Sequence, residues 1–263
     1  MKKKMITLLA AAMLTMSAAS SAMAAFAQGD LIRVVYDTLG TKEIATNLGS
    51  VSALTSYANG SILGGGIDAT TLAQFGGSSY SDLRVAYFSN DNATSSAWVS
   101  GTGDLSTTTA PTNGSLKYGG YKTNFASTIN QYNLFLSADG KVATLDNKSL
   151  TNSFFNKMDN KGAATGGFAN FLPTKPAGGV VSLAALATTG YVDQALYTWG
   201  STISNSANLG VRVGDVQKLT LRTLADGSTA IMTNAASTPI PPAFLLMGSG
   251  LLGMVGIRRK MTA

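Results

Sequence analysis

The chain has 263 residues, with 19 lysines and arginines against 13 aspartates and glutamates, so its formal net charge is +6. It contains no histidine and no cysteine, which excludes His-dependent triads, thiol nucleophiles, zinc or haem sites built on these residues, iron–sulfur clusters and disulfides. The surplus charge lies at the two ends, in Lys2–Lys4 and Arg258–Lys260. Without them basic and acidic residues are equal in number, and no nucleic-acid partner is expected.

The N-terminal 24 residues have the three parts of a secretory signal peptide. Basic residues Lys2–Lys4 precede an apolar stretch, Met5–Met16, and small residues lead to Ala22-Met23-Ala24, which fits the A-x-A recognition pattern of signal peptidase at Ala22 and Ala24. We expect cleavage after Ala24, and Ala25-Phe26-Ala27 offers a second site. The alternative is an uncleaved anchor helix, which the short apolar run and its small-residue end disfavour.

The segment from residue 25 to residue 236 is expected to be a single exported domain. It is rich in glycine, serine, threonine, asparagine and alanine, a composition more typical of a secreted, mostly β domain than of a helical enzyme. It is also long enough to bury one sizeable core without disulfides.

Short runs of β-branched and aromatic residues between turn signals predict strands along this domain. Asp139-Gly140 and Asp226-Gly227 favour the positive φ angles of tight hairpin turns, so each is expected to join two strands. In chain order, the predicted strands are residues 31–36 and 43–46 as one hairpin, then 84–88, 97–99, 132–136 with 142–145, 191–199, and 219–224 with 229–232.

Helical signals are fewer. Short helices are predicted over residues 68–75, 121–131 and 147–158, the last because Leu150, Phe154 and Met158 recur at helical spacing. The sum predicts a mainly β fold, a single β-sandwich or jelly-roll-like domain with a few short helices.

The carboxylates give no clear catalytic pattern. Glu43 is the only glutamate, and no motif selects a partner for it among the aspartates, so a carboxylate-dependent glycan hydrolase is the least favoured function. The residues Asn90-Asp91-Asn92 supply oxygen atoms that could bind Ca²⁺, but they lack the spacing of known loops, and a solvated turn is favoured. We therefore predict neither an enzyme, nor a cofactor, nor a metal site.

Aromatic residues suggest a carbohydrate-binding module as an alternative function. Trp98 and Trp199, with Tyr118 and Tyr121, could stack on the sugar rings of an exopolysaccharide. Packing in the core is the more common fate of tryptophan and is the favoured interpretation.

The C-terminal segment, residues 237–263, has its own three parts. Ser237–Pro242 is a proline-rich stretch that disfavours helix, Ala243–Ile257 follows with fifteen uncharged residues, and Arg258, Arg259 and Lys260 close the segment. As a helix the apolar run spans about 22 Å at ~1.5 Å per residue, which is short against a hydrocarbon core of about 30 Å. Its glycines allow close helix–helix approach in lipid, and they are Gly248, Gly250, Gly253 and Gly256.

The basic clusters at the two ends predict a topology. Positive residues beside short apolar segments stay on the cytoplasmic side of a membrane. Lys2–Lys4 and Arg258–Lys260 both follow this rule only if the segment between them crosses the membrane. The alternative, a buried core helix that ends a soluble domain, needs neither the prolines nor the basic terminus.

This tail resembles the PEP-CTERM sorting signal, the bacterial C-terminal tag that an exosortase recognises. Thr238-Pro239-Ile240-Pro241-Pro242-Ala243 is similar to the V-P-L-P-A variant of the tag, and Phe244–Arg259 follows the apolar run L-F-G-S-G-L-L-G-L-x-G that is common in that variant. The departures are Thr238 in place of Val, Pro242 in place of Ala, and the missing Glu between the prolines, which leaves the exosortase subtype open.

The resemblance implies a route and a class of protein. The chain would leave a Gram-negative cell through the general secretory pathway, lodge its tail transiently in the inner membrane, and be cut near Pro239-Ile240-Pro241 by the exosortase. Signal peptidase and exosortase are then its processing partners. The expected product is a structural or adhesive protein of the cell surface or of an extracellular exopolysaccharide matrix, such as that of a biofilm.

Overall fold

The computed structural model describes residues 25–63, 72–102, 115–116, 118–159, 161, 179–200, 210–212 and 219–233. The chain divides into two units, Met1–Thr233 and Asn234–Ala263, and every described residue belongs to the first. Its strands are β1 (Asp30–Asp37), β2 (Glu43–Ser50), β3 (Ile62–Leu63), β4 (Leu83–Asp91), β5 (Ser96–Thr102), β6 (Ser115–Leu116), β7 (Val142–Leu145), β8 (Val181–Ser182), β9 (Tyr191–Gly200), β10 (Gly210–Arg212), β11 (Leu219–Leu224) and β12 (Thr229–Thr233).

Helical structure is limited. One α-helix, α2 (Tyr118–Asn133), is accompanied in the described part of the chain by short segments of 3₁₀- or π-helix. The 3₁₀ turns are η1 (Val51–Ser56), η2 (Leu72–Phe75), η3 (Tyr80–Asp82) and η6 (Leu183–Ala187), and the π turn is η4 (Phe154–Met158).

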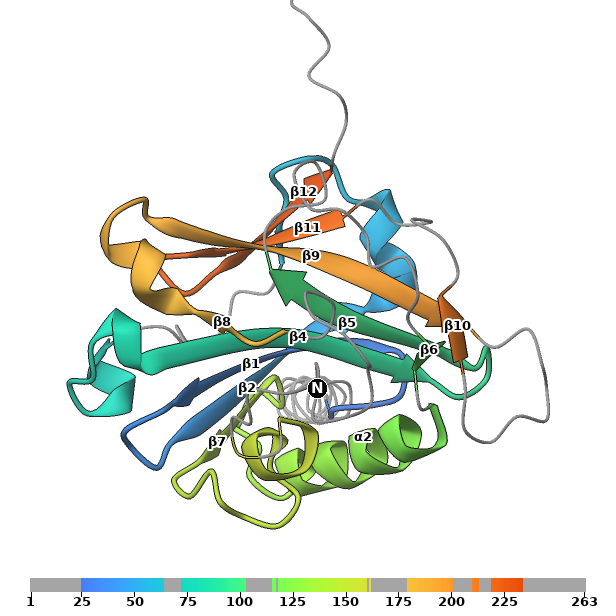
Figure 1. Ribbon diagram of the computed structural model, residues 1–263, viewed down its shortest axis with the longest axis horizontal. Helices are drawn as coiled ribbons and strands as arrows, with labels where there is room; N and C mark the ends of the chain where they lie inside the picture. The colour runs from blue at the N-terminus through green and yellow to red at the C-terminus, as the bar shows by residue number, and fades with distance from the viewer. Residues whose placement is uncertain are drawn as a thin grey trace, which may run out of the picture. The chain divides into compact units, whose positions relative to one another are not determined.

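The described strands form one curled antiparallel sheet (Figure 1). Its order is β3-β12-β11-β9-β5-β4-β1-β2-β7, with β8 paired to β4 and β10 paired to both β9 and β6. Every pairing is antiparallel. The predicted mainly β domain with few helices is therefore confirmed, and its strands belong to a single sheet.

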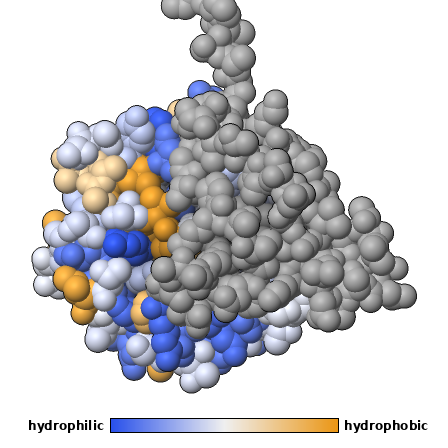
Figure 2. All heavy atoms as spheres, in the orientation of Figure 1, coloured by the Kyte–Doolittle hydropathy of each residue, from blue (hydrophilic) through white to orange (hydrophobic). Residues whose placement is uncertain are grey.

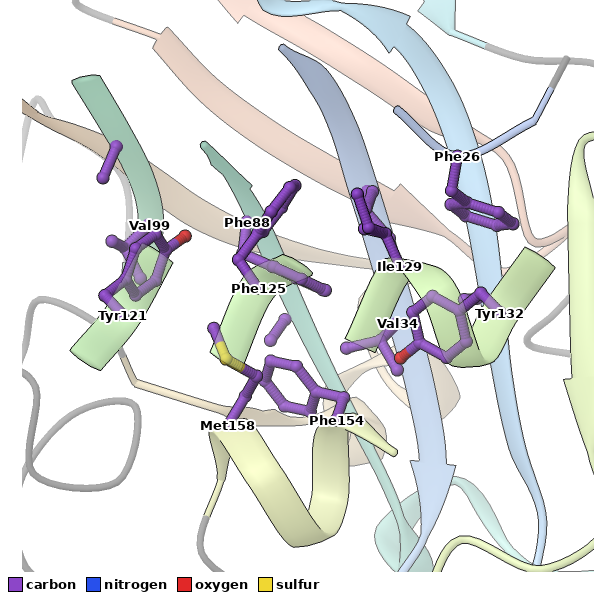
Figure 3. Packing of buried hydrophobic residues seen from close by; sticks show 14 of the residues in the cluster. Phe26, Val34, Phe88, Val99, Tyr121, Phe125, Ile129, Tyr132, Phe154 and Met158 are labelled. Carbon is purple, nitrogen blue, oxygen red and sulfur yellow. The ribbon is translucent and has the colours of Figure 1, made fainter. Parts of the chain in front are cut away.

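Both faces of the sheet are buried. Successive residues of a strand point to opposite faces, so each strand contributes side chains to both. In β1, Ile32, Val34 and Tyr36 belong to the face covered by α2, whereas Leu31 and Val35 belong to the other. Figure 3 shows the α2 side, where aromatic rings from the helix and from η4 pack onto the sheet. The helix contributes side chains at helical spacing, namely Tyr118, Tyr121, Phe125, Ile129 and Tyr132.

The opposite face has no long helix over it in the described residues. Short turns cover it instead, with Leu54 of η1, Phe75 of η2, and Leu183 and Leu186 of η6 packed among the strand residues. We call the two sides of the sheet the α2 face and the opposite face.

The predicted hairpins at the two ends of the domain are confirmed. Strands β1 and β2 pair in register from Ile32 to Tyr36, and β11 pairs with β12 across the Asp226-Gly227 turn. Gly227 has φ +82°, a conformation that favours glycine over residues with a Cβ. Strands β4, β5 and β9 also occur where the sequence predicts them, and β4 runs three residues further, through Asp91.

Two predictions in the middle of the chain are wrong. Residues 132–136 do not form a strand: Tyr132 belongs to the last turn of α2, and only Leu136 makes an isolated bridge, to Ala143. The apolar side of the helix extends to Tyr132, and its burial overrides the local β propensity.

The predicted helix over residues 147–158 shrinks to η4. The Asn147 side chain accepts from the N–H of Ser149 (2.9 Å), and the N–H of Lys148 donates to Thr41 O (2.5 Å). These bonds form a turn that competes with helix, so the helix begins only after Ser153, whose hydroxyl accepts from the N–H of Asn156 (3.2 Å).

Candidate functional site

The α2 face contains a cluster of buried ionisable groups centred on Glu43. This carboxylate, at the start of β2, is fully buried. Its Oε1 accepts hydrogen bonds from the Tyr132 hydroxyl (2.8 Å) and the N–H of Phe154 (2.9 Å), and its Oε2 accepts from the N–H of Phe155 (2.8 Å). The first N–H groups of a helical turn lack partners within it, so η4 presents two donors to the carboxylate. Glu43 thereby joins β2 to both α2 and η4.

A second buried carboxylate lies at the end of η4. Asp159 is 7% exposed, and its Oδ2 accepts from the Tyr36 hydroxyl at 2.5 Å. Lys148, 6% exposed, donates from Nζ to the carbonyl oxygens of Asp37 and Thr38 and lies 4.7 Å from the centre of the Phe155 ring. We call Tyr36, Glu43, Tyr132, Lys148 and Asp159 the acid cluster.

Burial dominates the electrostatics of the acid cluster. Loss of hydration raises the pKa of Glu43 from its usual 4.5 to about 7; the three hydrogen-bond donors offset part of this increase and the charge of Asp159 adds to it. Burial, together with the neighbouring carboxylates, also raises the pKa values of Tyr36 and Tyr132. For Lys148, burial lowers the pKa against the attraction of Asp37 and Glu43.

The hydrogen bonds and burial of Glu43 indicate that the acid cluster has a structural role. Both oxygens of Glu43 are occupied by donors of the protein and the side chain has no exposed surface. A carboxylate pair that hydrolyses a glycoside acts on a bond held between its members. Glu43 is instead enclosed, so it attaches the helical layer to the sheet.

The opposite face contains a buried cation, Arg33, which is 2% exposed. Its Nη1 donates to the carbonyl oxygen of Gly227 and to Thr229 Oγ1 (3.2 Å), and its Nη2 donates to Thr46 Oγ1 (3.3 Å). The hydroxyl of Tyr87 lies 2.6 Å from Thr223 Oγ1. These bonds connect β1 and β4 with β11 and β12, which lie several strands away in the sheet order.

Trp98, proposed from the sequence as a stacking residue, lies in the core of the opposite face and is 8% exposed. Trp199 pairs in register with Ala97 of β5. The side chain of Trp199 is outside the described part. Tyr118 and Tyr121 are also buried, so these three described rings pack in the core, as the favoured interpretation has it.

The Asn90-Asp91-Asn92 segment ends β4 and begins the turn to β5. Asp91 Oδ1 accepts from the N–H of Ala93 (2.9 Å), and Oδ2 accepts from the Thr94 hydroxyl (2.8 Å). The carboxylate thus stabilises its own turn. Over the described ranges, no group of three or more acidic side chains is placed to hold a metal ion.

The residues of the two terminal signals lie outside the described residues, and they are Ala22, Ala24, Pro239, Ile240, Pro241, Gly248, Gly250, Gly253, Arg258, Arg259 and Lys260. Within the portion that the structure describes, no helix is both long and apolar enough to cross a membrane. The predicted apolar helix over residues 243–257 is not part of that portion.

The sequence reasoning missed Arg33, Lys148 and Asp159 as members of buried polar networks. Arg33 had a visible signal, because it is the only charged residue in the apolar run Leu31–Tyr36. Asp159 and Lys148 had none, because their partners are more than a hundred residues away in the chain.

Comparisons with known proteins give no relative. A scan against protein-family models finds no match, and searches of curated proteins and of solved structures find no significant similarity.

Proposed function

We propose that the chain is an exported structural or adhesive protein of a bacterial surface or exopolysaccharide matrix, sorted and cut at its C-terminus by an exosortase. The observation that carries the proposal is the order of features in residues 237–263: the Pro239-Ile240-Pro241 motif, the apolar run and the basic end. The signal-peptide pattern at the other end supports the same route.

The architecture of the exported domain supports a passive role. Its only glutamate is enclosed, and the rings of Trp98, Tyr118 and Tyr121, which could stack on sugars if exposed, pack inside. On the side shown in Figure 2, the coloured residues are mostly hydrophilic or neutral, and hydrophobic ones form small groups. In this proposal the curled sheet acts as a sandwich-like body that presents a polar surface to the matrix.

The tail is the part that the proposed sorting enzyme reads. A run of fifteen uncharged residues gives a helix shorter than the hydrocarbon core of a bilayer, and its glycines leave a surface against which another membrane helix can pack. The basic end holds the last residues in the cytoplasm. The peptide bonds around Pro241 are then held near the outer surface of the inner membrane.

Intact-mass measurement of the protein recovered from its producing cells tests the processing. We expect the loss of residues 1–24 and of most residues after Pro241. A secreted or surface-bound species that still carries Arg258–Lys260 would contradict exosortase cleavage.

The basic end can be tested separately. Replacing Arg258, Arg259 and Lys260 with glutamine should block sorting, because the tail would no longer be retained on the cytoplasmic side. The matched control neutralises three exposed lysines of the exported domain, Lys122, Lys141 and Lys161, and changes the net charge equally. Localisation is measured by cell fractionation, and equal sorting of the two triple variants would refute the topology.

A further inference from the structure

A row of polar side chains crosses the opposite face where β4, β5 and β9 run side by side. Ser89 pairs in register with Trp98, and Trp98 pairs with Thr198. Residues directly opposite each other on adjacent strands point to the same side of the sheet, with the strands about 4.8 Å apart. The three side chains therefore form one line, which we call the polar row.

The polar row is buried yet lacks protein partners. Ser89 is fully buried and Trp98 is 8% exposed. Ser89 Oγ, Trp98 Nε1 and Thr198 Oγ1 are each inaccessible to solvent, and none of them has a hydrogen-bond partner among the described residues. A buried polar group without a partner destabilises the folded state, so three in a line indicate a missing ligand.

Neighbouring buried polar groups on the same strands, in contrast, have hydrogen-bond partners. Gln194 Nε2 donates to Ser100 Oγ (3.1 Å), and Ser100 Oγ also accepts from the N–H of Tyr87 (2.9 Å). These buried groups thus form hydrogen bonds within the sheet, whereas those of the polar row have no partner among the described residues. Gln194 Oε1 is likewise without a partner within the described part of the chain, and it adds an acceptor on β9.

The chemistry of the row selects the ligand. The indole N–H only donates, whereas serine and threonine hydroxyls both donate and accept. All three groups are neutral, which disfavours phosphate or carboxylate, since these anions are bound by charged donors. We propose that Ser89, Trp98 and Thr198 form an enclosed site for ordered water molecules.

The polar row does not depend on the processing of the tail. If intact-mass measurement disproved exosortase cleavage, the polar row would still require its ligand. If the row proved empty, the route of export would be untouched.

The indole N–H of Trp98 reports occupancy directly. In a Trp199→Phe background it is the only indole signal in a ¹⁵N-edited NMR spectrum, because the chain has two tryptophans. We expect a cross-peak between this N–H and a long-lived bound water, and its loss in the Ser89→Ala/Thr198→Val double variant. The matched control is Ser127→Ala, which removes a hydroxyl that donates to Thr123 O (3.0 Å) on the exposed side of α2.

A titration of the same sample with glucose, galactose, N-acetylglucosamine and their short oligomers tests whether the site is closed to larger ligands. A water cross-peak that no sugar alters supports the proposal. A saturable shift of the indole signal that displaces the water cross-peak would overturn it, because a sugar would then occupy the site. The absence of a water cross-peak to Trp98 N–H in the protein with Ser89 and Thr198 unchanged would also overturn it.

Discussion

Each face of the sheet buries a hydrogen-bonded ionisable side chain, Glu43 on one face and Arg33 on the other, and the two are stabilised by different means. On the α2 face, Glu43 receives two backbone N–H groups from η4 and the hydroxyl of Tyr132. On the opposite face, Arg33 donates to a turn carbonyl and to the hydroxyls of Thr46 and Thr229. The acid holds a helical layer onto the sheet, whereas the cation holds distant strands of the sheet together.

The difference follows from the elements that cover each face. The α2 face has a helix to cover it, and the buried acid fixes where that layer sits. The opposite face is covered by short turns, so the sheet must curl over it, and a long side chain with several donors can span the strands that approach each other. Burial is tolerated on each side because neighbouring residues form several hydrogen bonds with the buried side chain.

The largest loss of stability is expected from a cavity in the core of the α2 face. Phe125 is fully buried and packs edge-on against Phe88, with their ring centres 5.7 Å apart. Phe125→Ala should destabilise the domain by about 3–5 kcal/mol, because it leaves a cavity between helix and sheet. Chemical denaturation measures the change. The control Phe135→Ala, at a ring that is 42% exposed, should stay within about 1 kcal/mol of the wild type.

The acid on that face gives a pH dependence. A pKa raised from 4.5 to about 7 means that the folded state favours protonated Glu43, so its contribution is complete below pH 4.5 and is lost as the pH rises through 7. Between pH 5 and pH 9 this loss amounts to about 3 kcal/mol.

Glu43→Gln removes the ionisation and should remove this part of the slope, measured as the free energy of unfolding across the pH range. Asp146→Asn, at a side chain that is 88% exposed, serves as the control and should retain the slope. Equal slopes in the wild type and in the glutamine variant would show that Glu43 does not titrate there.

The smallest loss of stability is expected from a substitution on the opposite face. Arg33→Lys keeps the charge but cannot reproduce the planar fork that reaches Gly227, Thr229 and Thr46 together, so a loss of about 2 kcal/mol is expected. The control is Arg222→Lys, a more exposed arginine whose Nε lies 2.7 Å from Asp193 Oδ1, where about 1 kcal/mol is expected. If Arg33→Lys unfolded at the same urea concentration as the wild type, a single hydrogen bond from residue 33 would be enough to stabilise the sheet.

Local signals predicted the ends of the domain better than its middle. The hairpin from residue 31 to residue 47 and the Asp226-Gly227 hairpin are specified by short-range alternation and turn chemistry, and both occur. Tyr132 was misassigned because its neighbours have β propensity while its burial depends on the distant Glu43 and Phe26. A pattern of period two cannot reveal a contact across ninety residues.

The buried networks were harder still. The sequence marked Glu43 as unusual, since it is the only glutamate, but nothing local indicated that Phe154 and Phe155 would present their N–H groups to it. The polar row was hidden for the same reason. Ser89, Trp98 and Thr198 become neighbours only through the register of three strands, one of which is a hundred residues away.

The bonds of Arg33 also constrain the order in which the domain can mature. Their acceptors at Gly227 and Thr229 follow 194 and 196 residues later in the chain. During synthesis from the N-terminus, β1 is therefore complete while these acceptors are still missing. Contacts of such long range slow folding, so the sheet can close only after the final hairpin has been made.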